Sequence, residues 1–385
     1  MKTRIIYLLI LFFLLITGCV TEYMPKTEEN QDLLVVEGLI TDQPGQNKIM
    51  LSRSLPLGIR SEAIPVTRAS VTVSDNQGNV IYFHEFVTGS YVPADPNFRG
   101  VVGRIYKLNV RAYSPSQLFR NYESYPMELK PVPPIDSLYY EKVIISGPDI
   151  YNNTVDGCQI YVSTHDPANK CRYFRWKSAE TWEIRLPYTV QNHTCWVTDN
   201  TENINVKSTS SLSEAVVKKH PLYFISNHSD RLRVKYSCLV SQYSISEDEF
   251  SFWEKLQNLM EETGGLYDII PSNIPGNISC VDDPSEKILG YFSVSAVSTK
   301  RIFIKDQFMG QFNPYTNDAC VADTLFNGEF IPDLNINVWI LRDNQTPPYK
   351  VITYSKECAD CTTRGTTLEP SFWRDDKPLL LQKNP

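Results

Sequence analysis

Apolar and polar residues alternate with a period of two along much of this sequence. Residues 69–74 alternate valine with serine or alanine and threonine, and 104–113 and 231–243 repeat the pattern with larger side chains. Successive side chains of a β-strand point to opposite faces, so each segment predicts a strand with one buried and one solvated face. Apolar runs bounded by turn residues predict further strands at 32–40, 47–54, 80–86, 137–145, 157–165, 171–185, 289–297, 300–305, 335–341 and 349–354.

One segment has the period of a helix instead. Ser246, followed three residues later by Glu249, is the pattern of a capping box, and 252–260 carries apolar residues at helical spacing. The glycines at 264 and 265 favour an end to the helix. The sequence therefore predicts a helical insert near 247–262 that packs one face on a sheet. A protruding helix that binds a partner is the alternative interpretation.

The proline-rich segment 130–134 is a natural domain boundary, because three prolines cannot continue a sheet ladder. Before it, 32–130 predicts an Ig-like or transthyretin-like β-sandwich. After it, 131–385 predicts a larger β-rich sandwich domain, which contains the helix and ends in a cysteine-rich loop. The expected fold class is mainly β.

The N-terminus has the pattern of an export signal. A basic tip precedes an unbroken apolar run, 5–16, which is too short to span about 30 Å of hydrocarbon with ease. The sequence LITGC at 15–19 then resembles a bacterial lipobox, in which the cysteine is acylated and becomes the new N-terminus. We therefore expect a lipoprotein signal peptide at 1–18. A plain signal peptide with a chance cysteine is the alternative.

Acylation of Cys19 would anchor the protein to a membrane, because each buried methylene contributes about 0.8 kcal/mol. The polar segment 19–31 then predicts a flexible tether for the body. An aspartate directly after the acylated cysteine would resemble an inner-membrane retention signal. Cys19 is not followed by an aspartate, so we expect the outer membrane. The sequence does not indicate which face of that membrane the body occupies.

Nine cysteines less the acylated Cys19 leave eight, and an even number in an exported chain predicts up to four disulfides of open connectivity. The candidates are Cys158, Cys171, Cys195, Cys238, Cys280, Cys320, Cys358 and Cys361. Cys158 and Cys238 lie on apolar strand faces, where each is a buried thiol or half of a disulfide. For Cys358-x-x-Cys361 we favour a structural disulfide over a redox pair or half of a zinc site, because neighbouring acids raise thiol pKa values.

Several blocks resemble, in the same order, a family of Bacteroidota outer-membrane lipoproteins known only as a domain of unknown function (family 4249). The blocks are LVVEG at 34–38, PPIDSLYY at 133–140, QYSIS at 242–246, LGYF at 289–292, CADC at 358–361 and PSFW at 370–373. The resemblance implies an exported lipoprotein, often encoded beside a TonB-dependent receptor, over nearly the whole mature chain. The N-terminal part also resembles the regulatory β-sandwich that accompanies carboxypeptidases and such receptors.

Motifs for chemistry are scarce. The sequence has no phosphate loop, nucleophile elbow or HExxH motif, and its five histidines are scattered, so we expect no cofactor and no metal. The acidic clusters 247–249 and 282–286 are interpreted as solvated charge. A net charge of −7 argues against a nucleic-acid partner. Aromatic residues, Trp176 and Trp182 among them, fill a core or form a platform for a glycan or peptide.

The leading hypothesis is therefore that the protein is not an enzyme. We expect a non-catalytic, outer-membrane-anchored binding or accessory subunit, working with a TonB-dependent receptor in nutrient uptake or envelope assembly. The alternative is a secreted-type hydrolase of glycan or peptide, with carboxylates gathered from separated loops. A third hypothesis is a purely structural surface module.

Overall fold

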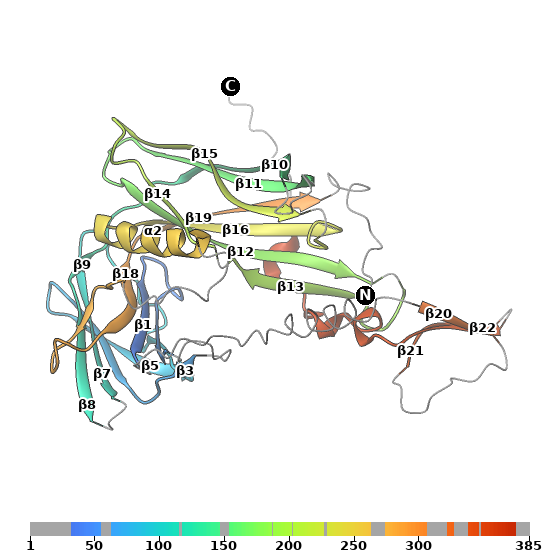
Figure 1. Ribbon diagram of the computed structural model, residues 1–385, viewed down its shortest axis with the longest axis horizontal. Coiled ribbons are helices and arrows are strands. Elements are labelled where there is room, and N and C mark those ends of the chain that lie inside the picture. The colour runs from blue at the N-terminus through green and yellow to red at the C-terminus, as the bar shows by residue number, and fades with distance from the viewer. Residues whose placement is uncertain are drawn as a thin grey trace, which may run out of the picture.

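The computed structural model describes residues 32–54, 63–114, 118–146, 154–186, 188–201, 203–226, 229–262, 274–305, 322–326, 338–345 and 348–374. Within these ranges the protein is mainly β with one α-helix, which confirms the predicted fold class (Figure 1). The expected signal peptide and tether, with the acylation site Cys19, lie outside the described residues. Cys320 lies outside them as well.

The first part of the chain forms an eleven-stranded sheet that curls around one core and is nearly closed. We call it the barrel unit. Its order is β17-β8-β7-β4-β5-β6-β2-β1-β18, with β3 on β2 and β9 on β7. The bounds are β1 Leu34–Ile40, β2 Lys48–Arg53, β3 Ile64–Pro65, β4 Ser70–Asp75, β5 Val80–Val87, β6 Ser90–Pro93, β7 Ile105–Tyr113, β8 Phe119–Ser124, β9 Met127–Glu128, β17 Ile278–Cys280 and β18 Ile288–Val294. The predicted alternation holds on β4, where Val71 and Val73 are buried.

Two strands of the barrel unit come from much later in the chain than the rest. β18 pairs with β1 in parallel register, and β17 pairs with β8. The close approach of β18 to β1 requires Gly290, whose φ is 90° and whose added Cβ would lie 2.1 Å from the carbonyl oxygen of Val36. The unit that begins at β1 is thus completed by residues 278–294, far beyond the proline-rich segment.

The second unit is a β-sandwich, in which two sheets pack face to face around a core of their own. We call it the second sandwich. One sheet has the order β10-β11-β15, and the other has the order β13-β12-β16-β19 with β14 on β12. The bounds are β10 Ile135–Ser146, β11 Thr154–Asp166, β12 Tyr173–Arg185, β13 Thr194–Asn200, β14 Asn205–Ser208, β15 Ala215–Ser226, β16 Lys235–Ser244 and β19 Val297–Lys305. Phe174 and Trp176 of β12 fill this core against Ile160 and Val162 of β11.

The C-terminal part adds a small sheet of order β20-β22-β21, drawn at the right of Figure 1. Short 3₁₀ helices follow it. The bounds are β20 Ala322–Phe326, β21 Trp339–Gln345, β22 Pro348–Thr353, η2 Lys356–Cys358, η3 Cys361–Thr363 and η4 Ser371–Arg374. In η4, Trp373 is buried against the second sandwich, where its indole N–H donates to a carboxylate oxygen of Glu183 at 3.4 Å.

The strands predicted at 289–297 and 300–305 are both present, but they belong to different sheets. β18 is in the barrel unit and β19 is in the second sandwich, so the two residues between them cross from one unit to the other. Ser295 holds this crossing: its N–H donates to the Ile40 carbonyl at 2.9 Å and its hydroxyl donates to the Ser244 carbonyl at 2.7 Å. The two units are therefore hydrogen-bonded at their junction.

The single α-helix of the described residues, α2, spans Glu247–Glu262, where the sequence predicts it. Phe252 packs into the barrel core, and Trp253 and Leu256 lie against that core. This confirms the prediction that the helix packs one face on a sheet, and not the alternative of a protruding helix. Figure 1 shows α2 along the junction between the barrel unit below and the second sandwich above. In the ranges described, no helix has the length and apolar character needed to cross a membrane.

Candidate functional site

A recess of about 850 Å³ opens between the barrel unit and the second sandwich, beside α2. Strands β1, β2 and β18 form one wall, and β12 and β16 form the wall opposite. Its apolar lining includes Val35, Leu39, Met50, Ile204, Phe252, Trp253, Leu256, Ile274, Leu289 and Tyr291. Small-molecule sites commonly have about 300–1,000 Å³ and mostly apolar walls with a few polar groups, so this recess has the size and lining of a binding site.

Strand β12 brings charge into the recess because its two faces differ. The side chains of Phe174 and Trp176 point into the core of the second sandwich. By the period of two, Arg175 and Lys177 point to the opposite face, where both line the recess. One short stretch of sequence thus supplies a core and the cations of a cavity.

Arg175 stacks on the indole ring of Trp253, with 3.3 Å between its guanidinium carbon and the ring centroid. Within the described ranges this guanidinium has no hydrogen bond and no ion pair. Burial lowers the pKa of Arg175 to about 10, and the negative charge of Glu249 opposes that shift. The group is therefore charged at neutral pH, with hydrogen-bond donors that no described residue accepts.

Lys177 lies two residues further along the same face. Its side chain is exposed to solvent, yet protein surrounds the ammonium in the concave site. Desolvation, with the like charge of Arg175 as the second cause, lowers the pKa of Lys177 to about 8. Like Arg175, it forms no hydrogen bond or ion pair with another described residue.

Glu249 is placed differently from the capping-box prediction. The Ser246 hydroxyl accepts the Glu249 backbone N–H at 3.1 Å, as predicted for the N-cap. The Glu249 carboxylate turns inward instead of back to the cap, and its Oε1 accepts from the Trp253 indole at 3.1 Å and from the Ser293 hydroxyl at 2.6 Å. Its Oε2 is buried without a partner among the described residues, and burial raises the pKa of this carboxyl.

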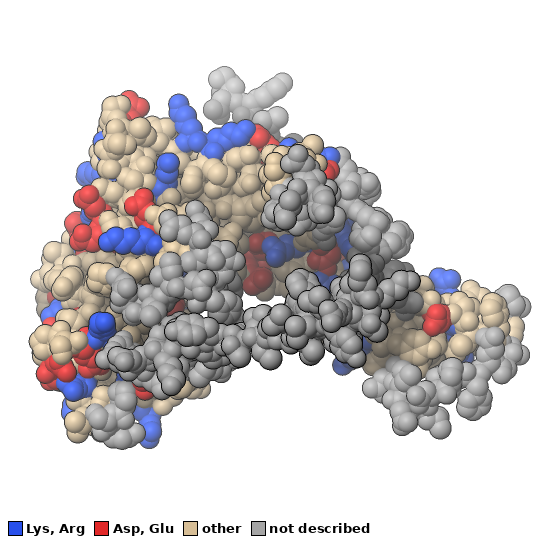
Figure 2. Space-filling model, in the orientation of Figure 1, with Lys and Arg blue, Asp and Glu red and all other residues tan. Residues whose placement is uncertain are grey.

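The charged lining of the recess thus consists of Lys48, Arg175 and Lys177 with one carboxylate, Glu37 of β1. Glu249 is buried beside Arg175 in a small adjacent void. Glu37 and Glu249 attract both Arg175 and Lys177, but none of the four forms an ion pair with a described residue. On the face drawn in Figure 2, basic and acidic side chains are interspersed. The face in this view therefore has no broad surface of one charge.

Four of the candidate cysteines, Cys158, Cys171, Cys238 and Cys280, are buried free thiols. For Cys158 and Cys238 this is one of the two interpretations that the sequence left open. For Cys171 and Cys280 the disulfide expected from cysteine parity does not form. Burial raises the pKa of the first three thiols to about 12. Such thiols stay protonated and behave as small apolar side chains, which is why the core accommodates them without a bond.

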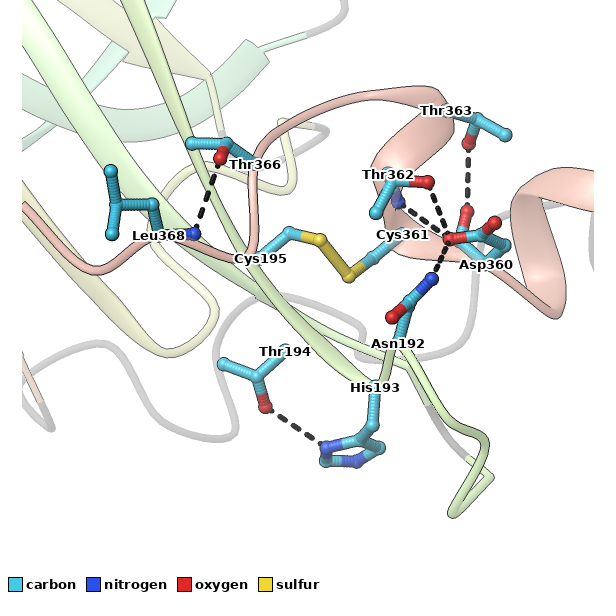
Figure 3. The surroundings of a disulfide bond; sticks show 10 residues. All are labelled: Asn192, His193, Thr194, Cys195, Asp360, Cys361, Thr362, Thr363, Thr366 and Leu368. Carbon is cyan, nitrogen blue, oxygen red and sulfur yellow. Dashed lines mark hydrogen bonds between the residues drawn. A yellow bond between two sulfur atoms is a disulfide. The ribbon is translucent and has the colours of Figure 1, made fainter.

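Cys361 forms a disulfide with Cys195 of β13, across 166 residues of sequence (Figure 3). Cys358 is disulfide-bonded too. The prediction of a bond within Cys358-x-x-Cys361 is therefore wrong about the pairing. The reason is local: Cys358 ends η2 and Cys361 begins η3, while Asp360 caps η3 by accepting the Thr362 N–H at 3.0 Å.

The same region is also attached to β13 by hydrogen bonds. The Asn192 side-chain amide donates to Asp360 at 2.9 Å, and the Thr366 N–H donates to the Trp196 carbonyl at 3.0 Å. Figure 3 shows Asn192 and Asp360 on one side of the Cys195–Cys361 bond and Thr366 on the other. The C-terminal loop is thus fastened to the second sandwich by a covalent bond and by backbone pairing.

The other candidates for chemistry are not brought to the recess. Asp282 accepts the Asn121 N–H at 2.6 Å, Asp283 accepts the Ser285 hydroxyl at 2.6 Å, and Glu286 accepts the Tyr122 hydroxyl at 2.9 Å. These acids hold the turn between β17 and β18. A search of the residues that the structure describes found no group of three or more metal-ligating side chains.

Arg175 and Lys177 were missed by reasoning from sequence. The available signal was a pair of basic residues two apart in a strand otherwise rich in aromatics, which places both cations on one face. A face with cations is ordinarily solvated, so the pattern alone does not distinguish a cavity from an open surface.

Comparison with protein families identifies the chain. Residues 20–301 match a domain of unknown function, DUF4249. The chain belongs to the DUF4249 family. A search of the curated proteins found no match. The matched span contains every residue described as lining the recess and ends before Cys358 and Cys361.

Proposed function

We propose that this DUF4249 protein is a non-catalytic, lipid-anchored binding or accessory subunit of the outer membrane, which takes up a ligand in the recess beside α2. The observation that carries the proposal is the combination of a cavity of about 850 Å³ with two cations that have no ion-pair partner among the described residues. Structural charges are ordinarily paired when they are enclosed, whereas binding sites hold polar groups ready for a ligand.

The proposed membrane anchor is Cys19 in the lipobox-like sequence LITGC. An acylated cysteine followed by the polar segment 20–31 would keep the body close to the bilayer while leaving it free to turn. A tether of this length reaches at most about 3.3–3.6 Å per residue. The protein would therefore act within a short distance of its membrane.

The proposed partner is a TonB-dependent receptor, as the family resemblance implies. In this arrangement the lipoprotein would capture a ligand for the receptor or complete its assembly. The junction location of the recess supports the proposal, because binding sites occur preferentially where two structural units meet.

The test is purification of the full-length protein from its own membranes in mild detergent, with Cys19→Ala as the matched control. We expect a TonB-dependent receptor, identified by mass spectrometry, to elute with the wild type, and the intact mass to include acyl chains. We expect Cys19→Ala to lose both the acyl mass and the membrane fraction. Recovery of the wild type alone would contradict the partnership, and an unacylated native N-terminus would contradict the anchor.

Hydrolysis is a second candidate, because the Glu37 carboxylate lines the recess and the Glu249 carboxylate is buried beside Arg175 in an adjacent void. Burial raises the pKa of Glu249, which is a property that a general acid needs. Incubation with short peptides and oligosaccharides, with product detection by mass spectrometry, tests this candidate. Turnover that is lost in Glu249→Gln would favour the hydrolase.

A further inference from the structure

The recess contains two cations, Arg175 and Lys177, that form no hydrogen bond or ion pair with another described residue. Arg175 and Lys177 are two residues apart on β12, so their Cα atoms are roughly 6.6 Å apart along the strand. Elsewhere on β12 an enclosed charge is paired, because Glu180 accepts from Arg231 at 2.8 Å. A cation that a cavity partly desolvates is less favourable without a counter-ion than with one, so two such cations side by side point to an anionic ligand that completes the site.

We propose that Arg175 and Lys177 bind the carboxylate of a ligand whose apolar body lies against Trp253 and the apolar wall of the recess. This inference rests on the proposed binding function of the recess, and it adds the chemical class of the ligand. A guanidinium presents its N–H donors as a planar fork that matches a carboxylate, and the neighbouring ammonium supplies further donors.

The charges around the cations favour a single negative charge on the ligand. Glu37 and the buried Glu249 already attract Arg175 and Lys177, so part of the positive charge of these two side chains is balanced before a ligand binds. A carboxylate carries one charge, whereas a phosphate monoester carries about −1.5 to −2 at pH 7. A phosphate would bring an excess negative charge close to both carboxylates.

The size and walls of the recess give the ligand its apolar body. A carboxylate alone would occupy a small part of about 850 Å³. Phe252, Leu256 and Tyr291 add apolar surface beyond Trp253, whose ring is already held by Arg175. The C-terminal residue of a peptide and a free aromatic or branched organic acid share this chemistry.

Protonation of Lys177 gives the proposal a second, independent observable. Its pKa is about 8 in the free protein, and an anion at the site would raise that pKa. Affinity should therefore be highest below pH 8 and fall as the pH rises through that value. The charged and titratable groups that line the recess around Lys177 are Glu37 on β1, Lys48 on β2, Arg175 on β12, Tyr243 on β16 and Tyr291 on β18. Glu249 on α2 also acts on Lys177 from an adjacent void.

The experiment is calorimetric titration of the full-length protein in detergent with matched probes. Phenylbutyrate is compared with phenylbutyramide, and acetylated leucyl-phenylalanine is compared with its C-terminal amide. We expect at least one acid to bind about 30-fold or more tightly than its amide, because each amide leaves the cations unpaired. Arg175→Gln and Lys177→Gln should each reduce this preference, whereas the exposed Lys218→Gln on β15 should keep it.

The probes also separate the sources of the carboxylate. Preference for the peptide acid assigns the site to peptide C-termini, and preference for phenylbutyrate assigns it to free organic acids. The inference is overturned if no acid binds, if acid and amide bind alike, if phenyl phosphate binds more tightly than both acids, or if Arg175→Gln retains the full preference. None of these results bears on co-purification with the receptor, which tests the proposed function separately.

Discussion

The two faces of β12 hold polar groups in opposite ways. On the core face, the Trp176 indole donates to the Gln242 side chain at 2.9 Å, and the Gln242 amide donates to the Pro133 carbonyl at 2.8 Å and to Thr164 at 3.1 Å. On the recess face, Arg175 and Lys177 donate to no described residue. The same strand therefore carries a satisfied network on one side and unused donors on the other.

This difference separates stability from binding. A buried polar group that has its partners specifies the packing around it, and its loss leaves those partners unpaired. A cation without a partner contributes little to folding and is available to a ligand. Mutations on the core face should therefore lower the free energy of unfolding. Mutations on the recess face should mainly lower the affinity for a ligand.

The largest expected effect is at Gln242, which is fully buried. Gln242→Ala leaves the Trp176 indole and the Pro133 carbonyl without partners and opens a cavity. We expect the free energy of unfolding to fall by about 3–5 kcal/mol, measured by urea denaturation. A loss below about 1 kcal/mol would show that the core network is not structural.

An effect of intermediate size is expected when a paired and an unpaired arginine, Arg231 and Arg175, are each replaced by alanine. Arg231→Ala removes the partner of the buried Glu180, and burial already raises the pKa of that carboxyl. Because Arg231 is partly exposed, we expect a loss of about 2 kcal/mol. For Arg175→Ala we expect a change within about 1 kcal/mol, because this substitution breaks no ion pair and removes mainly the stacking on Trp253. Equal losses in the two variants would remove the distinction between the faces.

The smallest expected effect is at Lys177, and its sign depends on pH. The pKa of about 8 in the folded protein lies below the ordinary value of 10.5, so the folded state binds this proton more weakly than the unfolded chain. Ionised Lys177 therefore destabilises the protein below pH 8, and this penalty disappears as the pH rises from 8 toward 10.5.

We accordingly expect Lys177→Met to be more stable than the wild type at pH 7. The gain should be no more than about 1 kcal/mol, because the side chain is exposed and solvent screens its charge. The difference in urea midpoint should shrink between pH 8 and pH 10, while Lys218→Met serves as the exposed control. A difference that does not change with pH would show that Lys177 has an ordinary pKa in the folded protein.

Local patterns in the sequence predict the elements well and their partners poorly. The alternation at 69–74 and the helical spacing after Ser246 appear in the structure as β4 and α2. The parallel pairing of β1 with β18 joins residues some 250 positions apart, and no local pattern specifies it. The sequence pattern likewise shows that Cys358 and Cys361 are close, but not that Cys361 bonds to Cys195.

The candidate site has the same limitation. The period of two places Arg175 and Lys177 on one face, but only the packing of α2 and β18 turns that face into a wall of a recess. Glu249 is the converse case, because its capping pattern predicts a role at the helix terminus, whereas Ser293 and Trp253 hold its carboxylate inside. The positions of the two cations and of the Glu249 carboxylate thus depend on contacts between segments that are distant in sequence.

The most direct test of the recess is the number of protons taken up when a carboxylate ligand binds. Titration with phenylbutyrate at pH 8, in two buffers of different ionisation enthalpy, measures this number. Because Lys177 is about half protonated at pH 8, we expect uptake of up to about half a proton, falling toward zero at pH 6. Lys177→Met should take up none. Zero uptake by the wild type at pH 8, or equal uptake by the wild type and Lys177→Met, would contradict the account.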